Sequence, residues 1–408
     1  MTFQNITRRG LLKTGAIFGA DLAVPTIFTS SAAQAFTNDP TGKTVTFGFT
    51  VPQSGPDADE GADELRAFQL AVKHLNGEGD GGMLSTFSSK VLGGKVLGGK
   101  ILDGKVLDGK VLDGKGLMGS KIVDVSGDTQ TKTDAARALA KSMIEKDGAI
   151  MISGGSSSGE AIGLQALCQD AGLIYMCGLT HSNDTTGKDK KRNGFRLFFN
   201  AALSARARAP VLKTDYGTDR KAYHLTADYT WGWTQQASMQ AATEGIGWQT
   251  TANVLTPLEN TDFSSCIAPV LNSGADVLIL NHYGANMVNS LTQAVQFGLR
   301  DKMANGKQFA IVVPLISELM AKGAGANIKG IPGSSNWNWK LQDEGTKAFV
   351  KSYGTEYGMP PSQAVQVCHA QTLLYADTVA RAKSFNPCAV VEALEGYTFD
   401  GPGNGPTV

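Results

Sequence analysis

The stretch from residue 149 to residue 184 constrains the fold more than any other part of the chain. It opens with a short apolar run, breaks at the small polar sequence GGSSSG, continues as an amphipathic segment ending at Gly172, and then repeats the apolar run and the polar turn. This order of strand, turn, helix, strand and turn is typical of a βαβ unit, whose two strands lie parallel in one sheet. The chain therefore contains a parallel sheet covered by helices.

Predicted strands and helices alternate on both sides of this unit. Further strands are predicted at residues 44–50, 121–125, 222–226, 248–254, 276–280 and 309–313. Helices are predicted at residues 209–216 and from Asp262 onward, residues 344–394 are predicted to be mainly helical, and the glycine- and proline-rich tail after residue 400 is predicted to be a loop. Such alternation indicates the α/β class with right-handed crossovers. We expect two doubly wound, Rossmann-like lobes with parallel-sheet cores and a cleft between them.

Two polar turns, at residues 154–159 and 178–182, follow adjacent predicted strands. Ligands of open parallel sheets bind at the carboxyl ends of the strands, so both turns lie where a ligand is expected. Ser156, Ser157 and Ser158 would also lie at a helix N-terminus, whose unpaired N–H groups and dipole favour a carboxylate or a similar acceptor. We expect these turns to hold one end of a small molecule.

Composition excludes several classes of function. The formal net charge is zero and no basic stripe with interleaved aromatic residues occurs, so nucleic acid is not an expected partner. The five cysteines show no CxxC pair and no metal-ligand spacing. Cys168 and Cys177 fall on the helix and strand of one βαβ unit and are predicted to be buried thiols. We expect neither a metal nor a cofactor.

The first 35 residues are typical of an export signal. Arg8 and Arg9 precede an apolar run that ends in Ala33-Gln34-Ala35. This order is that of a secretory signal peptide, and the paired arginines favour the twin-arginine route over an ordinary secretory signal. The mature protein is expected to begin near Phe36 and to reach the periplasm already folded.

Residues 89–120 contain a five-residue repeat of the form VLGGK or VLDGK. This period is compatible with a small β-solenoid, but the few copies and the Gly-Lys pair in each favour a solvated loop or hairpin insertion. We assign no ligand chemistry to it.

The mature chain from Thr44 to about Pro406 resembles the periplasmic solute-binding proteins of ABC importers, in the leucine/isoleucine/valine-binding class that also includes amide and urea binders. The resemblance rests on the order of several motifs: TVTFGFTVPQSGP, GDTQTKTDAARALAKSMIEKDGA, GGSSSGEA, GLTHSND, DYTWG, TDFSS and SGADVLILNHYG. It implies a type I periplasmic binding protein whose two lobes are joined by hinge crossings near Asn200, Asn336 and Gly401.

The resemblance also implies domain bounds. The first lobe would combine residues 36–200 with residues 337–400, and the second lobe would span residues 201–336. Residues 401–408 would then be a truncated third crossing.

In the first lobe the resemblance implies roles for individual residues. Ser156 looks like the serine whose hydroxyl and N–H hold the ligand carboxylate, with Ser157 beside it. Thr180 looks like the threonine that binds from the next turn, and the backbone of Gly178 or Leu179 would accept from a ligand amine.

In the second lobe, Trp231 and Tyr283 match aromatic positions that would stack on the ligand after closure. Amino-acid binders usually supply a carboxylate for the ligand ammonium after the strand that here ends at Val313. This chain has Leu315 and Ile316 there instead. A simple carboxylate, an amide or an aromatic acid therefore competes with an α-amino acid as the expected ligand.

The resemblance implies a monomeric, non-enzymatic protein that delivers a small molecule to an ABC permease in the cytoplasmic membrane. A periplasmic ligand sensor would use the same lobes. GSSSG also matches the G-x-S-x-G elbow of α/β-hydrolases, which would make Ser157 a nucleophile with a histidine such as His369. No histidine lies in a strong partner motif, and ligand contact or a structural hydrogen bond both remain open for His181 and His282.

Overall fold

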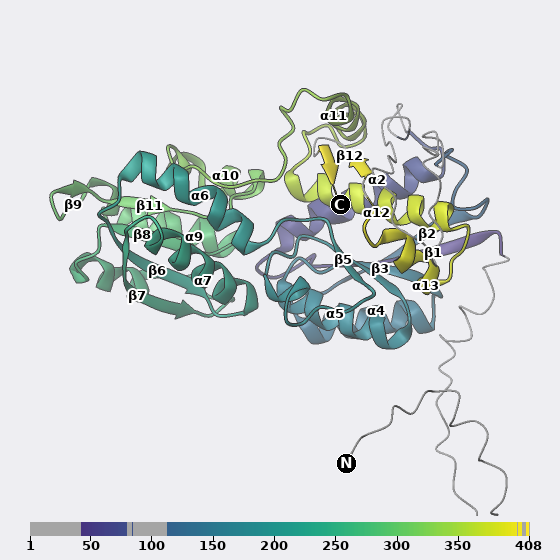
Figure 1. The fold of residues 1–408 in the computed structure, drawn as a ribbon, viewed down its shortest axis with the longest axis horizontal. Helices are drawn as coiled ribbons and strands as arrows, with labels where there is room; N and C mark the ends of the chain where they lie inside the picture. Colours follow the sequence, from purple (N-terminus) through teal and green to yellow (C-terminus); the bar gives the residue numbers. More distant parts are fainter. Residues whose placement is uncertain (1–41, 80–83, 85–111, 398, 402–404, 408) are drawn as a thin grey trace, which may run out of the picture.

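The computed structural model describes residues 42–79, 84, 112–397, 399–401 and 405–407. The predicted export signal and most of the five-residue repeat lie outside these residues. Two separate parallel sheets, each with helices on both faces, form two lobes that lie side by side (Figure 1). The predicted α/β class with two doubly wound cores is therefore confirmed.

The first sheet has five parallel strands in the order β2-β1-β3-β4-β5. Their bounds are β1 Thr44–Val51, β2 Lys121–Asp128, β3 Ala149–Gly154, β4 Ile174–Cys177 and β5 Gly194–Arg196. In the register, Phe47 pairs with Asp124 of β2 on one side and with Met151 of β3 on the other. The chain thus winds outward in opposite directions from β1, which places a crevice at the carboxyl ends of β1 and β3.

Successive side chains on these strands point to opposite faces of the sheet. Phe47 and Phe49 lie in the core cluster with Phe68 and Tyr375, whereas Tyr175 lies in the cluster on the other face. The helices of the first face are α2 Ala58–Leu75, α12 Gln363–Ala382 and α13 Pro387–Leu394, and those of the second are α4 Thr133–Glu145 and α5 Ser158–Ala171. Helix α11, Glu344–Tyr357, packs beside α2.

The second sheet has four parallel strands in the order β11-β8-β6-β7. Their bounds are β6 Lys221–Ala227, β7 Gln249–Thr256, β8 Val277–Asn281 and β11 Ala310–Val312. Leu278 and Leu280 lie in one core cluster, and Val277 and Ile279 lie in the cluster of the opposite face. The surrounding helices are α6 Ala201–Tyr216, α7 Thr230–Glu244, α9 Gly284–Gln296 and α10 Glu318–Ala324, with a small ladder of β9 Met303–Ala304 and β10 Lys307–Gln308 at one end.

The structure differs from three local predictions. Helix α6 begins at Ala201, well before the predicted residue 209, because Asn200 caps it by accepting from Leu203 N at 2.9 Å. The helix expected after Asp262 is only the short α8 Ser264–Ile267, since it gives way at Ala268–Asn272 to a 3₁₀ turn containing a proline. The tail predicted as a loop forms a hairpin of β12 Phe399–Gly401 and β13 Gly405–Thr407.

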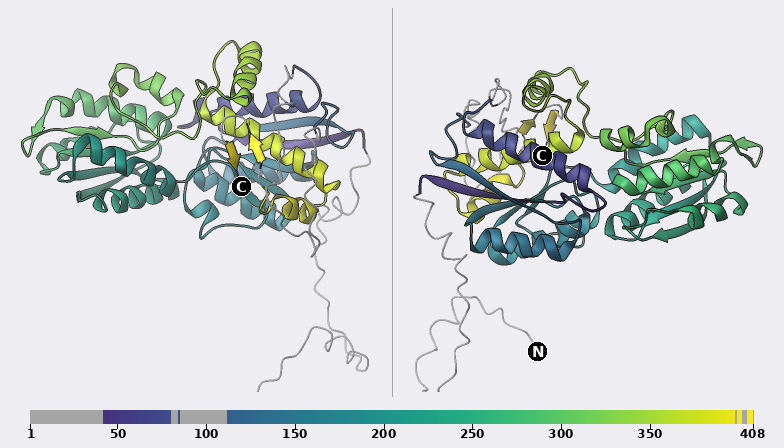
Figure 2. Two further views of the ribbon diagram at one scale, coloured as in Figure 1. Left: turned by 45° about the horizontal axis from the view of Figure 1, so that its top comes forward. Right: turned by 180° about the vertical axis from the view of Figure 1, so that it is seen from behind.

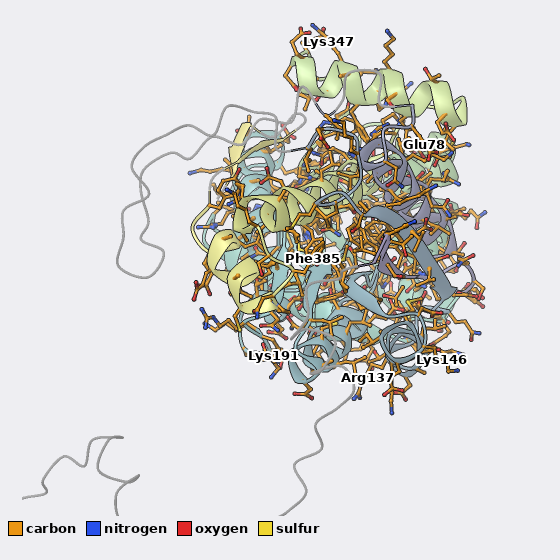
Figure 3. All side chains as sticks on the ribbon, turned by 90° about the vertical axis from the view of Figure 1, so that its right-hand side faces the viewer. Glu78, Arg137, Lys146, Lys191, Lys347 and Phe385 are labelled. Carbon is orange, nitrogen blue, oxygen red and sulfur yellow. The ribbon has the colours of Figure 1, made fainter. Side chains whose placement is uncertain are left out.

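The two lobes meet along one side of the first lobe only (Figure 2). Figure 3 shows the opposite end of that lobe, where the exposed side chains of Lys347, Arg137 and Lys146 lie at the rim. Among the described helices, none combines the length and apolar character needed to cross a bilayer.

Candidate functional site

The first lobe presents two loops where the order of its sheet reverses. The loop after β1 runs through Asp57 into α2, and the loop after β3 runs through Ser156 and Ser157 into α5. Both loops stand at the carboxyl ends of their strands, and each ends in a helix N-terminus. They form the first wall of the candidate site.

The second lobe presents an equivalent pair of loops. Its strand order reverses between β6 and β8, and the loops that follow these strands carry Tyr229 with Trp231 and Tyr283, respectively. The ring centroids of Trp231 and Tyr283 lie 6.1 Å apart, and those of Trp231 and Tyr229 lie 6.0 Å apart. The second wall is therefore aromatic.

The two walls touch at the start of α2. Ser317 Oγ of the second lobe donates to Glu60 Oε1 of the first at 2.5 Å. Gly284 has a φ of +54°, and a Cβ added there would lie 2.7 Å from Asp57 Oδ1. Glycine thus fits both the left-handed backbone and the close approach of the other lobe.

A second set of hydrogen bonds joins the lobes beside α5. Ser182 Oγ and Thr230 Oγ1 lie 3.1 Å apart, and Asn183 Nδ2 donates to Ser238 Oγ at 3.0 Å. Of the two first-lobe residues, Ser182 is the last residue of the polar turn after β4 and Asn183 follows it directly. The lobes are therefore in contact on two sides of the facing loops.

The hydroxyl groups of both predicted serines have protein partners. Ser157 caps α5, where its side chain accepts from Gly159 N at 3.3 Å and Glu160 accepts from Ser157 N at 3.0 Å. This reciprocal pair is a capping box. Ser156 Oγ donates to a carboxylate oxygen of Glu64 on α2.

Thr180 lies next to these serines but is fully buried. Its hydroxyl donates to Ser158 Oγ at 3.0 Å and lies 3.2 Å from Thr185 Oγ1. Ser158 Oγ also accepts from the backbone N of Ser182 at 3.0 Å. The hydroxyl of Ser158, the third serine at the predicted helix N-terminus, therefore joins the two predicted turns.

Gly178 and Leu179 lie between Thr180 and the sheet. Gly178 N donates to Gly154 O at 2.7 Å, and Leu179 is buried in the core of the first lobe. A Cβ added to Gly178 would lie 2.7 Å from Glu64 Oε2, so its backbone stands directly beside that carboxyl group.

Of the predicted aromatic residues, the structure brings Trp231 and Tyr283 together and adds Tyr229 to them. Trp231 is 2% exposed, and its Nε1 has no hydrogen-bond partner among the described residues. This donor is therefore buried at the junction of the lobes without a protein acceptor.

The site also contains buried carboxyl groups that were not predicted from the sequence. Asp57, Glu60 and Glu64 follow one another at spacings of three and four residues. Asp57 is 5% exposed and Glu60 is 1% exposed, whereas Glu64 and Glu160 of α5 are fully buried. Acidic residues in the first turn of a helix are usually solvated and favour the helix dipole. The available signal was the repeated spacing, which places the side chains on one helix face directly after the first strand.

Burial controls the protonation of these four groups. It raises the pKa of Asp57 to about 6, that of Glu160 to about 7 and that of Glu64 to about 8. Burial also raises the pKa of Glu60 well above its usual value, although the Ser317 hydrogen bond partly opposes this shift. Among the described residues, no lysine, arginine or histidine forms an ion pair with any of the four.

The carboxyl groups and the aromatic wall face each other. The charges of Glu60, Asp57 and Glu64 add to the effect of burial in raising the pKa of Tyr283. A cavity of about 300 Å³ opens along the lobe junction, with Asp57, Glu60, Gly284 and Met320 in its lining. In the described part of the chain, no cluster of three or more ligating side chains has a geometry that would hold a metal ion.

All five histidines are buried, and their contacts are structural or aromatic. Burial lowers the pKa of His181 and of His282 to about 3. His282 lies between Thr256 and Ser290, and His369 Nε2 lies 2.9 Å from His74 Nδ1. The Ser157 side chain, in contrast, caps α5 and accepts from Gly159 N. Cys168 and Cys177 are buried free thiols, as predicted.

Comparison with solved structures finds the same two-lobed fold. A periplasmic binding protein from Burkholderia mallei superimposes with a TM-score of 0.73 at 20% identity, over 88% of this chain and 84% of that one. A solute-binding protein of an ABC transporter from Rhodopseudomonas palustris, in complex with 3,4-dihydroxybenzoic acid, gives 0.71 at 18% identity over 90% and 88%. A leucine-binding protein from Thermotoga maritima gives 0.68 at 15% identity over 89% and 93%.

A search of curated proteins finds no match to this sequence. The sequence profile of the periplasmic binding proteins, however, matches residues 44–408, from the first strand through the last hairpin. Both lobes and the facing loops fall within this match. The chain belongs to the periplasmic binding protein family.

Proposed function

We propose that this chain is the extracytoplasmic solute-binding subunit of an ABC importer, which captures a small polar ligand between its lobes. The observation that carries the proposal is that the reversal points of the two parallel sheets face each other across hydrogen-bonded contacts. A ligand that touches both walls at once favours the arrangement in which the lobes are together.

Closure would occur by rotation about the segments that join the lobes. In this proposal the first lobe combines residues 36–200 with residues 337–400, the second lobe spans residues 201–336, and residues 401–408 are a truncated third crossing. Packing of Trp337, Phe349 and Tyr353 in the core cluster of the first sheet supports the return of the chain to that lobe after α10.

In this proposal the first lobe holds one end of the ligand with Ser156, Ser157 and the N-terminus of α5. The backbone of Gly178 and Leu179 and the Thr180 turn support that end. Trp231 and Tyr283 cover the ligand from the second lobe. Micromolar affinity requires about 8 kcal/mol, which several charge-assisted hydrogen bonds and one stacked ring supply.

The loaded monomer would act in the periplasm after twin-arginine export and would pass its ligand unchanged to a permease in the cytoplasmic membrane. The family match supports a binding role over hydrolysis, and the Ser157 side chain serves as the cap of α5. A sensor that hands its closed form to a receptor would use the same site.

The proposal is tested by uptake in a strain from which the gene has been deleted. The wild-type chain is expected to restore uptake of its ligand, and Trp231→Ala is expected to restore it poorly while still folding. If deletion of the gene leaves ligand uptake unchanged but abolishes a transcriptional response to the ligand, the sensor role is favoured. Retention of the unprocessed chain in the cytoplasm on replacing Arg8 and Arg9 by lysine would support the export route.

A further inference from the structure

The carboxyl groups at the start of α2 differ from ordinary acidic residues of a helix N-terminus. Asp59 lies in the same first turn and is exposed, whereas Asp57, Glu60 and Glu64 are at most 5% exposed. Helix-dipole stabilisation does not require burial, and burial of a charged carboxylate without a cationic partner is costly. Stability alone therefore gives no reason for this arrangement.

Two buried polar atoms point to a ligand at this place. Glu60 Oε1 accepts from Ser317, but Glu60 Oε2 has no partner among the described residues, and neither has Trp231 Nε1. Both residues are at least nine-tenths buried. They belong to opposite walls of the site, so a carboxyl oxygen of one lobe and an N–H donor of the other are buried at the junction of the lobes without a partner in the described part of the chain.

We propose that the captured ligand carries a positively charged amine, which Glu60 and Glu64 bind between the rings of Tyr229, Trp231 and Tyr283. This inference rests on the proposed function and assigns the charge of its ligand. An ammonium group would supply the cation that the four carboxyl groups lack. It would also relieve the mutual repulsion that, with burial, holds the pKa values of Glu60 and Glu64 high.

The aromatic wall suits the same ligand. A cation placed against the faces of tryptophan and tyrosine rings is attracted by their quadrupoles, most strongly in a site without water. The Trp231 N–H provides a donor in addition, so the ligand is expected to carry an oxygen acceptor besides its amine. An anion such as a benzoate would meet the carboxyl groups unfavourably.

The carboxylate expected after Val313 is thus replaced by carboxylates of the other lobe. Glu318 is the acidic residue nearest that position in sequence. Its two carboxylate oxygens already accept hydrogen bonds, from Gln363 N at 3.1 Å and from Asn338 Nδ2 at 3.4 Å. Glu60 reaches the same junction from α2 and contacts Ser317, the residue immediately before Glu318.

The test is calorimetric titration of the mature chain with compounds of similar size and different charge: 4-amino-1-butanol, butylamine, butyramide, butyrate, L-leucine and benzoate. The amines are expected to bind, with the amino alcohol tightest. Glu60→Gln and Glu64→Gln, which keep an acceptor for the serine hydroxyls, are expected to weaken amine binding at least tenfold. Asp134→Asn, an exposed acid in the first turn of α4, is the matched control and should bind normally.

The outcomes separate the two proposals. Binding of butyramide, butyrate or benzoate in preference to every amine-bearing compound, L-leucine included, would overturn the assignment of the amine and leave the solute-binding function standing. Equal amine affinity in the glutamine variants and in Asp134→Asn would also overturn it. Failure of all six compounds to bind would count against the charge assignment and the binding function together.

Discussion

Ser317 Oγ, at the N-terminus of α10 in the second lobe, donates to Glu60 Oε1, in the first turn of α2 in the first lobe. The same hydroxyl accepts from Met320 N at 3.0 Å and so caps α10. The Ser317 side chain therefore caps the N-terminus of α10 and also joins the two lobes at the buried carboxyl groups. This contact allows the energy of lobe association to be measured separately from that of the helix cap.

A double-mutant cycle between these residues should show coupling. Ser317→Ala loses the cap, at about 0.5–2 kcal/mol, and also the bond to Glu60. In a Glu60→Ala background the bond to Ser317 is already absent, so Ser317→Ala then removes only the cap. We expect a coupling free energy of about 0.5–3 kcal/mol from denaturant unfolding. Additive effects of the two substitutions would show that the contact contributes nothing to stability.

A disulfide between the lobes should block ligand entry. Ser182 Oγ and Thr230 Oγ1 are 3.1 Å apart, so cysteines at both positions are placed to bond when the lobes are together. In a Cys388→Ser background, which removes an exposed thiol, the oxidised double-cysteine variant should bind ligand far more slowly, and reduction should restore the rate. Unchanged association in the oxidised protein, with each single-cysteine variant as control, would refute entry through this junction.

The order of strands and helices was predictable because local patterns specify it. Apolar runs bounded by small polar turns identified the strands, and their alternation with helices required parallel sheets. The early start of α6 was missed because the Asn200 cap precedes a segment with little amphipathic character. The shortness of α8 reflects the proline that follows it, which the apolar spacing alone does not reveal.

The site was predictable only in part. The turns at Ser156 and Thr180 follow strands that are neighbours in the sheet, so their proximity follows from topology. The pairing of Glu60 with Ser317 joins residues 257 positions apart in sequence and depends on how the lobes meet. Sequence spacing also does not show whether an acidic helix face is buried, and that burial changes the expected charge of the ligand.

Thr180→Ala should affect stability as well as binding. Its buried hydroxyl bonds Ser158 and Thr185, so its loss leaves buried partners unpaired and should cost about 1–3 kcal/mol of unfolding free energy. Thr180→Ser keeps the hydroxyl and should cost about 1 kcal/mol through the lost methyl. Denaturation and calorimetric titration of both variants test this expectation. Full stability of Thr180→Ala would exclude a structural role for the hydroxyl.

The ligand-free protein should lose a stabilising contribution as pH rises. Burial raises the pKa of Glu64 from 4.5 to about 8, with the charges of Glu160 and Asp57 adding to the shift. The folded state therefore keeps a proton that the unfolded state releases above pH 4.5, and the contribution declines up to about pH 8. Compared with Glu64→Gln, the wild-type chain should become progressively less stable between pH 5 and pH 8. A constant difference between the two proteins over this range would contradict a raised pKa.

Amine binding at pH 7 should release protons. Glu64, with a pKa of about 8, is mainly protonated before binding, and an ammonium group beside it would favour the carboxylate. Titration with 4-amino-1-butanol in buffers of low and high ionisation enthalpy should give different apparent binding enthalpies, corresponding to release of up to about one proton from this group. Because Glu64→Gln removes the titrating group, it should reduce the difference between buffers. Equal binding enthalpies in the two buffers for the wild-type chain would show that the carboxyl groups do not ionise on binding. The carboxyl groups would then contact the ligand in their protonated form, through hydrogen bonds between neutral groups.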